Sequence, residues 1–74
     1  MRCFLGDAQR GKYVVVGCAG CEYPKWLEKQ GLCIGAKLTV AQNNKHYVLF
    51  VIENSKCAID KKSAGIIWVD ECDE

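Results

Sequence analysis

The chain has 74 residues, half of them hydrophobic and 26% charged, with a formal net charge of +1. This length allows one domain, because domains usually run to about 50–250 residues. The near-neutral charge argues against a nucleic-acid-binding protein, which needs a basic excess. The sequence has neither the roughly 18 consecutive apolar residues of a membrane span nor the apolar run of a secretory signal, so the expected location is the cytoplasm.

The first element predicted along the chain is a strand over Lys12–Gly17, which is β-branched and aromatic and is bounded by glycine. A short helix is predicted next. Pro24 suits its first turn, good helix formers follow to Gln30, and Gly31 is a natural residue to end it. Leu32 then stands where an apolar contact commonly closes a Schellman motif.

Three short strands are predicted in succession after the helix. They are expected at Lys37–Ala41, Tyr47–Ile52 and Lys56–Ile59, where apolar residues alternate or form a run too short for a typical helix. Gln42–His46 predicts a hairpin turn, because asparagine tolerates positive φ, and Glu53–Ser55 predicts the next turn.

The chain closes with a helical turn and one more strand. The turn is predicted from Asp60, a suitable N-cap, to about Ile66, and the strand at Trp68–Val69. The acidic tail from Asp70 to Glu74 is expected to be solvated and frayed. Together these elements predict a mainly β domain over residues 1–74. We expect a small, partly open barrel of about five strands, with one short helix after the first strand and a helical turn before the last.

Several segments share the order and the separations of a known family. They are Gln9–Lys12, Trp26–Leu32, Cys33–Val40, Tyr47–Ile52, Ser55–Ile59 and Ser63–Val69. Ile34 stands where that family usually has proline, and Asn54 stands where it has glycine, a mild exchange if φ is positive there. The chain from about Phe4 to Val69 thus resembles the FeoA-type domain, a small SH3-like barrel.

The resemblance implies a function as well as a fold. It implies a non-enzymatic accessory protein of bacterial ferrous-iron uptake, which docks on the cytoplasmic part of the FeoB-type permease. A related domain is appended to iron-dependent repressors. It implies no catalytic residues. The near-neutral charge and the lack of a long apolar run predict no nucleic-acid partner and no direct insertion into a membrane.

The sharpest local signal is Cys18-Ala19-Gly20-Cys21, because two thiolates at this spacing can bind one Zn²⁺. A closed structural site needs four ligands, and Cys33 and Cys57 are the first candidates to complete it. Cys3, Cys72 and His46 are the others. The alternative function is therefore a thiol-based domain that binds or senses a transition metal. Zn²⁺ and Fe²⁺ are the candidate ions, and the sequence identifies no other cofactor.

Other interpretations of the cysteines stay open. A disulfide framework would need an oxidising compartment, and a thioredoxin-like redox motif would need a longer chain. Reduced cysteine also packs as a small hydrophobe. On that interpretation Cys33 and Cys57 lie in or beside the core.

The predicted helix also carries a candidate surface for a protein partner. Tyr23 and Trp26 are favoured anchors of protein interfaces, and Lys25 and Lys29 lie alongside. The alternative is that Trp26 or Leu27 packs the helix onto the barrel. A second candidate is the hairpin tip, since loops on rigid scaffolds often carry binding.

A small nucleic-acid-binding barrel is the third functional class that the sequence allows. The aromatic residues of the predicted strands could stack on bases if they were exposed. These residues are Tyr13, Tyr47, Phe50 and Trp68. The near-neutral charge disfavours this interpretation.

Overall fold

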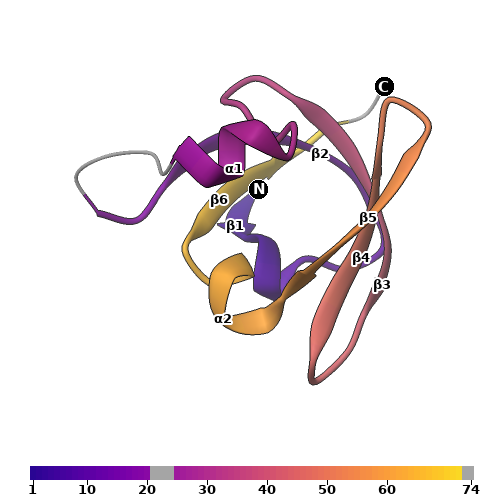
Figure 1. The fold of residues 1–74 in the computed structure, drawn as a ribbon. Coiled ribbons are helices and arrows are strands. Elements are labelled where there is room, and N and C mark those ends of the chain that lie inside the picture. The colour runs from indigo at the N-terminus through magenta and orange to yellow at the C-terminus, as the bar shows by residue number, and fades with distance from the viewer. Residues whose placement is uncertain (21–24, 73–74) are drawn as a thin grey trace.

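The computed structural model describes residues 1–20 and 25–72. The elements are β1 (Arg2–Phe4), the 3-10 turn η1 (Leu5–Asp7), β2 (Gly11–Cys18), α1 (Lys25–Lys29), β3 (Lys37–Asn43), β4 (Tyr47–Ile52), β5 (Ser55–Asp60), α2 (Lys61–Ala64) and β6 (Ile67–Glu71). The strands form one antiparallel sheet in the order β1-β6-β2-β3-β4-β5. Figure 1 shows this sheet curled around the core, so the predicted mainly β, partly open barrel is confirmed.

The core lies on the inner face of this curled sheet. Along β4 the inward side chains Val48, Phe50 and Ile52 are buried, and the alternate positions face outward. The other buried hydrophobic residues are Leu5, Ala8, Tyr13, Val15, Leu27, Leu32, Leu38, Val40, Ile59, Ala64, Ile67 and Val69. Because the side-chain period of a strand is two, the alternation seen in the sequence fixes which face of each strand is buried.

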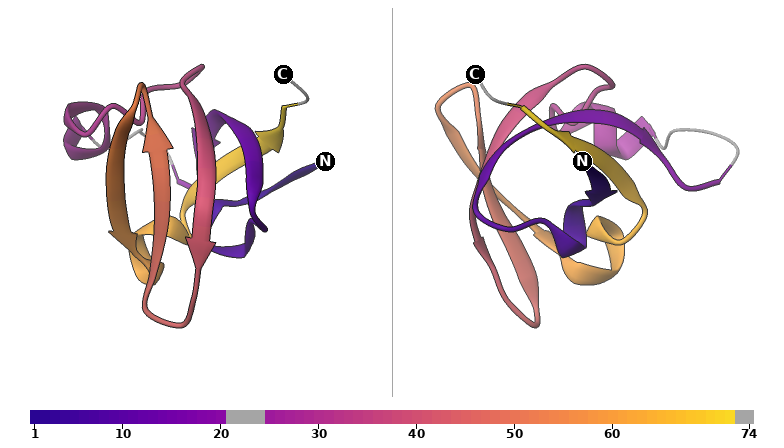
Figure 2. Two further views of the ribbon diagram at one scale, coloured as in Figure 1. Left: turned by 90° about the vertical axis from the view of Figure 1, so that its right-hand side faces the viewer. Right: turned by 180° about the vertical axis from the view of Figure 1, so that it is seen from behind.

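Two irregularities in strand pairing accompany the curl of the sheet. The pairing of β2 with β6 shifts between Val15 and Gly17, and that of β3 with β4 shifts between Val40 and Gln42. Such bulges bend a strand and increase its twist. Figure 2 shows the resulting barrel from the side and from behind. The barrel stays open because β1 and β5, at the two ends of the strand order, are not paired with each other.

The predicted end of the first helix is confirmed in detail. The Leu32 amide donates to the Leu27 carbonyl at 3.0 Å, and the Gly31 amide donates to the Glu28 carbonyl at 3.0 Å. These are the two bonds of a Schellman motif, with Gly31 at a φ of 88°. Leu27 and Leu32 are both fully buried, so the cap also anchors the helix to the core. Pro24 lies outside the described residues.

The predicted second helical turn is confirmed as α2. The carboxylate of Asp60 accepts a hydrogen bond from the Ser63 amide at 3.1 Å, which makes Asp60 the N-cap. Ala64 and Ile67 are fully buried. Within the described residues, no helix is long and apolar enough to cross a membrane.

The turn between β4 and β5 contains two residues, Glu53 and Asn54, with φ angles of 49° and 69°. Asn54 therefore has the positive φ that its place in the FeoA pattern predicts. Ser55, expected in the turn, belongs instead to β5 and pairs with Ile52. The turn between β3 and β4 is also shorter than predicted, because β3 extends to Asn43.

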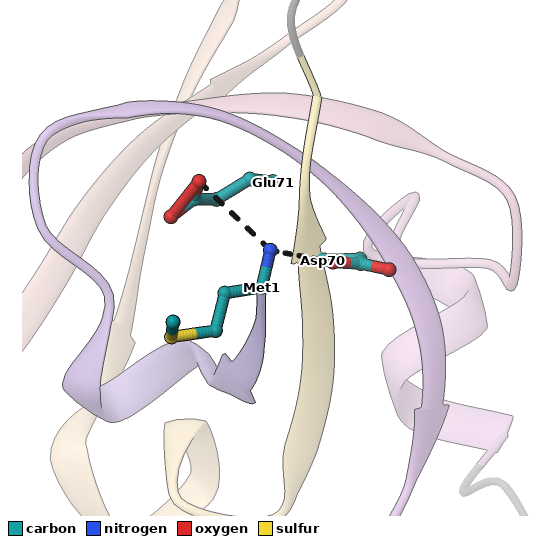
Figure 3. Close-up of polar contacts among 3 residues, drawn as sticks. All are labelled: Met1, Asp70 and Glu71. Atoms are coloured by element: carbon teal, nitrogen blue, oxygen red, sulfur yellow. Dashed lines mark ion pairs between the residues drawn. The ribbon is translucent and has the colours of Figure 1, made fainter.

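The structure differs from the sequence-based prediction near both ends of the chain. It adds one strand, β1, which pairs with β6 through Arg2 opposite Asp70. Asp70 and Glu71, expected in a frayed tail, belong to β6. Figure 3 shows the terminal ammonium of Met1 beside both carboxylates, with N···O distances of 3.3 Å to Asp70 and 3.9 Å to Glu71. The acidic residues here are strand residues with partners, because they lie between two other strands.

We predict that Gly31→Ala destabilises the fold by about 1 kcal/mol, because alanine at positive φ brings its Cβ too close to the following carbonyl. Gly17→Ala is the matched control. Gly17 has no positive φ, and no heavy atom lies within 4 Å of the position its Cβ would take. Urea unfolding measures both variants. Equal stability of the two variants would contradict the prediction.

Candidate functional site

The candidate partner-binding face is the outer side of α1. Leu27 is fully buried and holds the helix against the core, whereas the Trp26 side chain is 43% exposed. Lys25 and Lys29 are exposed on the same helix. Tyr23, the other aromatic residue predicted at this surface, lies outside the described residues.

The structure therefore separates the two roles that the sequence allowed for Trp26 and Leu27. Leu27 packs, and Trp26 is left with a large part of its indole in solvent. An indole offers a large apolar area together with one N–H donor, and such side chains dominate many interfaces. With two ammonium groups nearby, the face suits a partner surface that is apolar and acidic.

Of the cysteines predicted as metal ligands, the three that the structure describes lie in separate parts of the fold. Cys18 ends β2, where it pairs with Ile67 and is half-buried. Cys57 is half-buried on β5, as expected for a cysteine beside the core. Cys33 follows α1 and is exposed, so its expected place in or beside the core is wrong. At the end of the Schellman cap the Leu32 side chain is buried in the core, whereas the next side chain, Cys33, points to solvent.

No group of three or more His, Cys, Asp and Glu side chains in residues 1–20 and 25–72 is placed to hold a metal ion. The structure therefore does not bring Cys18, Cys33 and Cys57 together. Cys21 lies outside the described residues, so pairing of Cys18 with Cys21 stays a prediction. Gly20, between them, has a φ of 117°, which permits a sharp change of chain direction there.

Cys3 has surroundings that suppress its reactivity. Burial raises the pKa of its thiol, and the nearby carboxylates of Asp7 and Glu71 raise it further. A raised pKa keeps the thiol protonated, and the thiolate is the nucleophile and metal ligand. Cys3 is therefore a poor candidate for metal binding at neutral pH.

A polar cleft that the sequence did not predict lies between η1 and the β3–β4 hairpin. The Asn43 amide nitrogen donates to the carbonyls of Gly6 at 3.0 Å and Ala8 at 2.8 Å. The Lys61 ammonium donates hydrogen bonds to the Gly6 carbonyl and to the side-chain oxygen of Asn43. Arg10 also lines the cleft. These bonds tie three separate segments together, so Asn43 and Lys61 have a structural role.

The hairpin tip is smaller than predicted and is internally bonded. The side-chain oxygen of Asn44 accepts from the His46 and Tyr47 amides at 2.8 and 3.0 Å. His46 is exposed. The tip is thus a compact Asx-type turn, which holds its own backbone.

Most of the aromatic residues considered for base stacking are already engaged. Tyr13 and Phe50 lie in the core. Trp68 stacks on Phe4 across β1 and β6, with ring centroids 3.8 Å apart and an interplanar angle of 24°. Tyr47 remains exposed on the outer face of β4.

Comparison with known families gives one match, which covers most of the chain. The family model described as the FeoA domain matches residues 5–71. No curated protein sequence matches the chain.

Solved structures with this fold fall into two groups. The first contains a crystal structure titled as an iron uptake regulatory protein (FeoA), with a TM-score of 0.82 and 26% identity over 93% of this chain and 96% of that one. It also contains a FeoA-like protein from Clostridium acetobutylicum, with a TM-score of 0.77 and 15% identity over 99% and 90% of the two chains.

The second group contains longer proteins. ScaR with bound Cd²⁺ has a TM-score of 0.80 and 18% identity over 92% of this chain, which spans only 35% of ScaR. At this identity the likeness to ScaR concerns the fold alone.

We predict that Cys33 is alkylated by iodoacetamide faster than Cys3 in the folded protein at neutral pH. Cys33 is exposed, whereas Cys3 is half-buried and has a raised pKa, so less of it is thiolate. The rate at Cys3 should reach half its maximum only above the ordinary thiol pKa. Peptide mapping by mass spectrometry after timed quenching measures both rates. Faster labelling of Cys3 would contradict the assignment.

The alternative, metal-binding function predicts that Cys18 and Cys21 supply two of the ligands of one Zn²⁺ per reduced chain, since paired thiolates favour this soft ion. The double variant Cys18→Ser/Cys21→Ser should lose the zinc adduct in native mass spectrometry. The control variant Cys33→Ser should keep the zinc adduct, because Cys33 is exposed and belongs to no group of metal-ligating side chains in the described residues. A zinc-free mass for the wild type would refute this prediction.

Proposed function

The chain belongs to the FeoA domain family, and from that membership we propose that it is a non-enzymatic accessory protein of ferrous-iron uptake. In this proposal it acts in the cytoplasm by docking on the cytoplasmic part of a FeoB-type permease. The family match and the similarity to an iron uptake regulatory protein support the role in iron uptake.

The observation that carries the docking site is the exposure of Trp26 on a firmly anchored helix. The Schellman cap and the buried side chains of Leu27 and Leu32 fix the backbone of α1. An anchor residue on a fixed backbone loses little conformational freedom when a partner covers it, and this preorganisation favours affinity. Trp26 is both exposed to a partner and carried on such a fixed backbone.

Lys25 and Lys29 give this face its expected electrostatic behaviour. Exposed ammonium groups attract an acidic partner over a range set by the ionic strength, about 8 Å at physiological salt. They contribute to the rate of association more than to final affinity. Docking through α1 should therefore be faster at low salt. The protein would modulate transport by binding alone and would need no chemistry of its own.

We predict that Trp26→Ala weakens binding to the purified cytoplasmic part of the permease of the same organism by at least about tenfold. Tyr47→Ala is the matched control, because Tyr47 is another partly exposed aromatic residue but lies on β4. Isothermal titration calorimetry measures affinity, and circular dichroism confirms that both variants are folded. Equal loss in both variants would remove α1 as the docking site. Absence of binding by the wild type would overturn the proposed function.

A further inference from the structure

The edge of the sheet at β5 offers a second contact surface, which does not involve α1. Within the described residues, β5 pairs with β4 and with no other strand. Its residues Lys56, Ala58 and Asp60 are exposed. An unpaired strand edge presents a row of amide and carbonyl groups that can pair with another chain.

One hydrogen bond identifies which backbone groups of β5 face this edge. The Lys61 amide donates to the His46 carbonyl at 3.2 Å, and these two residues flank the pair Tyr47 and Asp60. In an antiparallel ladder this bond makes Tyr47 and Asp60 a non-hydrogen-bonded pair. Asp60 therefore points its amide and carbonyl away from β4.

The same orientation recurs at every second residue of β5. Since paired residues alternate along an antiparallel ladder, Ala58 and Lys56 also direct their amide and carbonyl groups outward. As the N-cap of α2, Asp60 gives its carbonyl to the first hydrogen bond of that helix, so only its amide is free at the edge. The amide and carbonyl groups of Lys56 and Ala58, together with the Asp60 amide, can form a hydrogen-bonded ladder with a second strand.

The charges on these positions are symmetric about Ala58. Lys56 lies two residues before Ala58 and Asp60 two residues after it, and all three lie on the outer face with Val51, Leu49 and Tyr47 of β4. Asp60 stays ionised at neutral pH, because hydrogen bonds from Ser63 hold the pKa of its carboxyl below the usual value. A strand with this pattern is complementary to itself when it runs antiparallel.

We propose that β5 is the pairing site for a second copy of this chain. The two β5 strands run antiparallel about a two-fold axis at Ala58, so that Ala58 of each copy lies opposite Ala58 of the other. Lys56 of one copy then faces Asp60 of the second copy, twice by symmetry. Cys57 lies opposite Ile59 on the inner side, where both side chains are apolar.

The occupant is a second copy because the charge pattern selects it. A lysine on an edge strand usually opposes pairing with other strands. A strand that places an acidic residue opposite Lys56 and a lysine opposite Asp60 turns this repulsion into attraction, and a second β5 run antiparallel does both. Strands that place like charges opposite Lys56 or Asp60 are disfavoured.

Two variants test the pairing. Ala58→Pro removes an amide that faces the open edge and leaves the ladder with β4 in place, since proline is tolerated on an edge strand with its nitrogen toward solvent. Lys56→Glu places like charges opposite each other in both symmetric pairs. Lys12→Glu is the matched control, because it makes the same charge change at an exposed strand position on β2.

Sedimentation velocity on the full chain, reduced and at concentrations up to about 1 mM, measures the monomer–dimer equilibrium. We expect the wild type and Lys12→Glu to dimerise equally. Lys56→Glu should raise the dissociation constant by about tenfold or more, because two attractive pairs become repulsive. Ala58→Pro should abolish the dimer. A monomeric wild type, or a dimer that Lys56→Glu leaves unchanged, overturns the proposal even if Ala58→Pro fails to fold.

Discussion

The inner face of β4 is the part of the molecule on which the candidate surfaces depend. Val48, Phe50 and Ile52 are all buried there, and Phe50 is the largest fully buried side chain among residues 1–20 and 25–72. β3 and β5 pair with this strand on its two sides. A Cβ placed on Gly31, just after α1, would lie 3.9 Å from the Ile52 side chain. A domain this small buries only about 60% of its unfolded surface. Few residues are therefore free for functions other than packing.

The elements that sequence analysis predicted well are those specified by local chemistry. Gly31 and Leu32 form the Schellman cap, and Asp60 forms the N-cap, because each needs only neighbours within one helical turn. β1 was missed because its three residues are too few to show a period. Asp70 and Glu71 were misassigned because acidic residues resemble a solvated tail until two distant strands, β1 and β2, pair with β6.

The candidate sites were less predictable, because they depend on packing and on contacts between residues distant in the sequence. The helix α1 has five residues, too few for periodicity to decide whether Trp26 or Leu27 faces the core, and only packing separates them. The bond between Lys61 and Asn43 joins residues 18 positions apart, and neither side chain carries a local signal of its partner. The cysteines likewise carry no local signal of their partners. Their sequence positions leave open whether they converge, and the described ones lie in different parts of the fold.

The two open edges of the barrel differ in a way that bears on how the chain avoids indiscriminate association. β1 has three residues and begins beside the Met1 ammonium and the carboxylates of Asp70 and Glu71, so it is a short and charged template for pairing. β5 has six residues, and its edge carries one positive and one negative side chain at equal distances from Ala58. Because β1 is so short, it can form few hydrogen bonds with an added strand. At β5, like charges disfavour a strand that places a lysine opposite Lys56 or an acidic residue opposite Asp60. The barrel can therefore remain open at both edges while only β5 offers a selective contact, separate from the exposed Trp26 on α1.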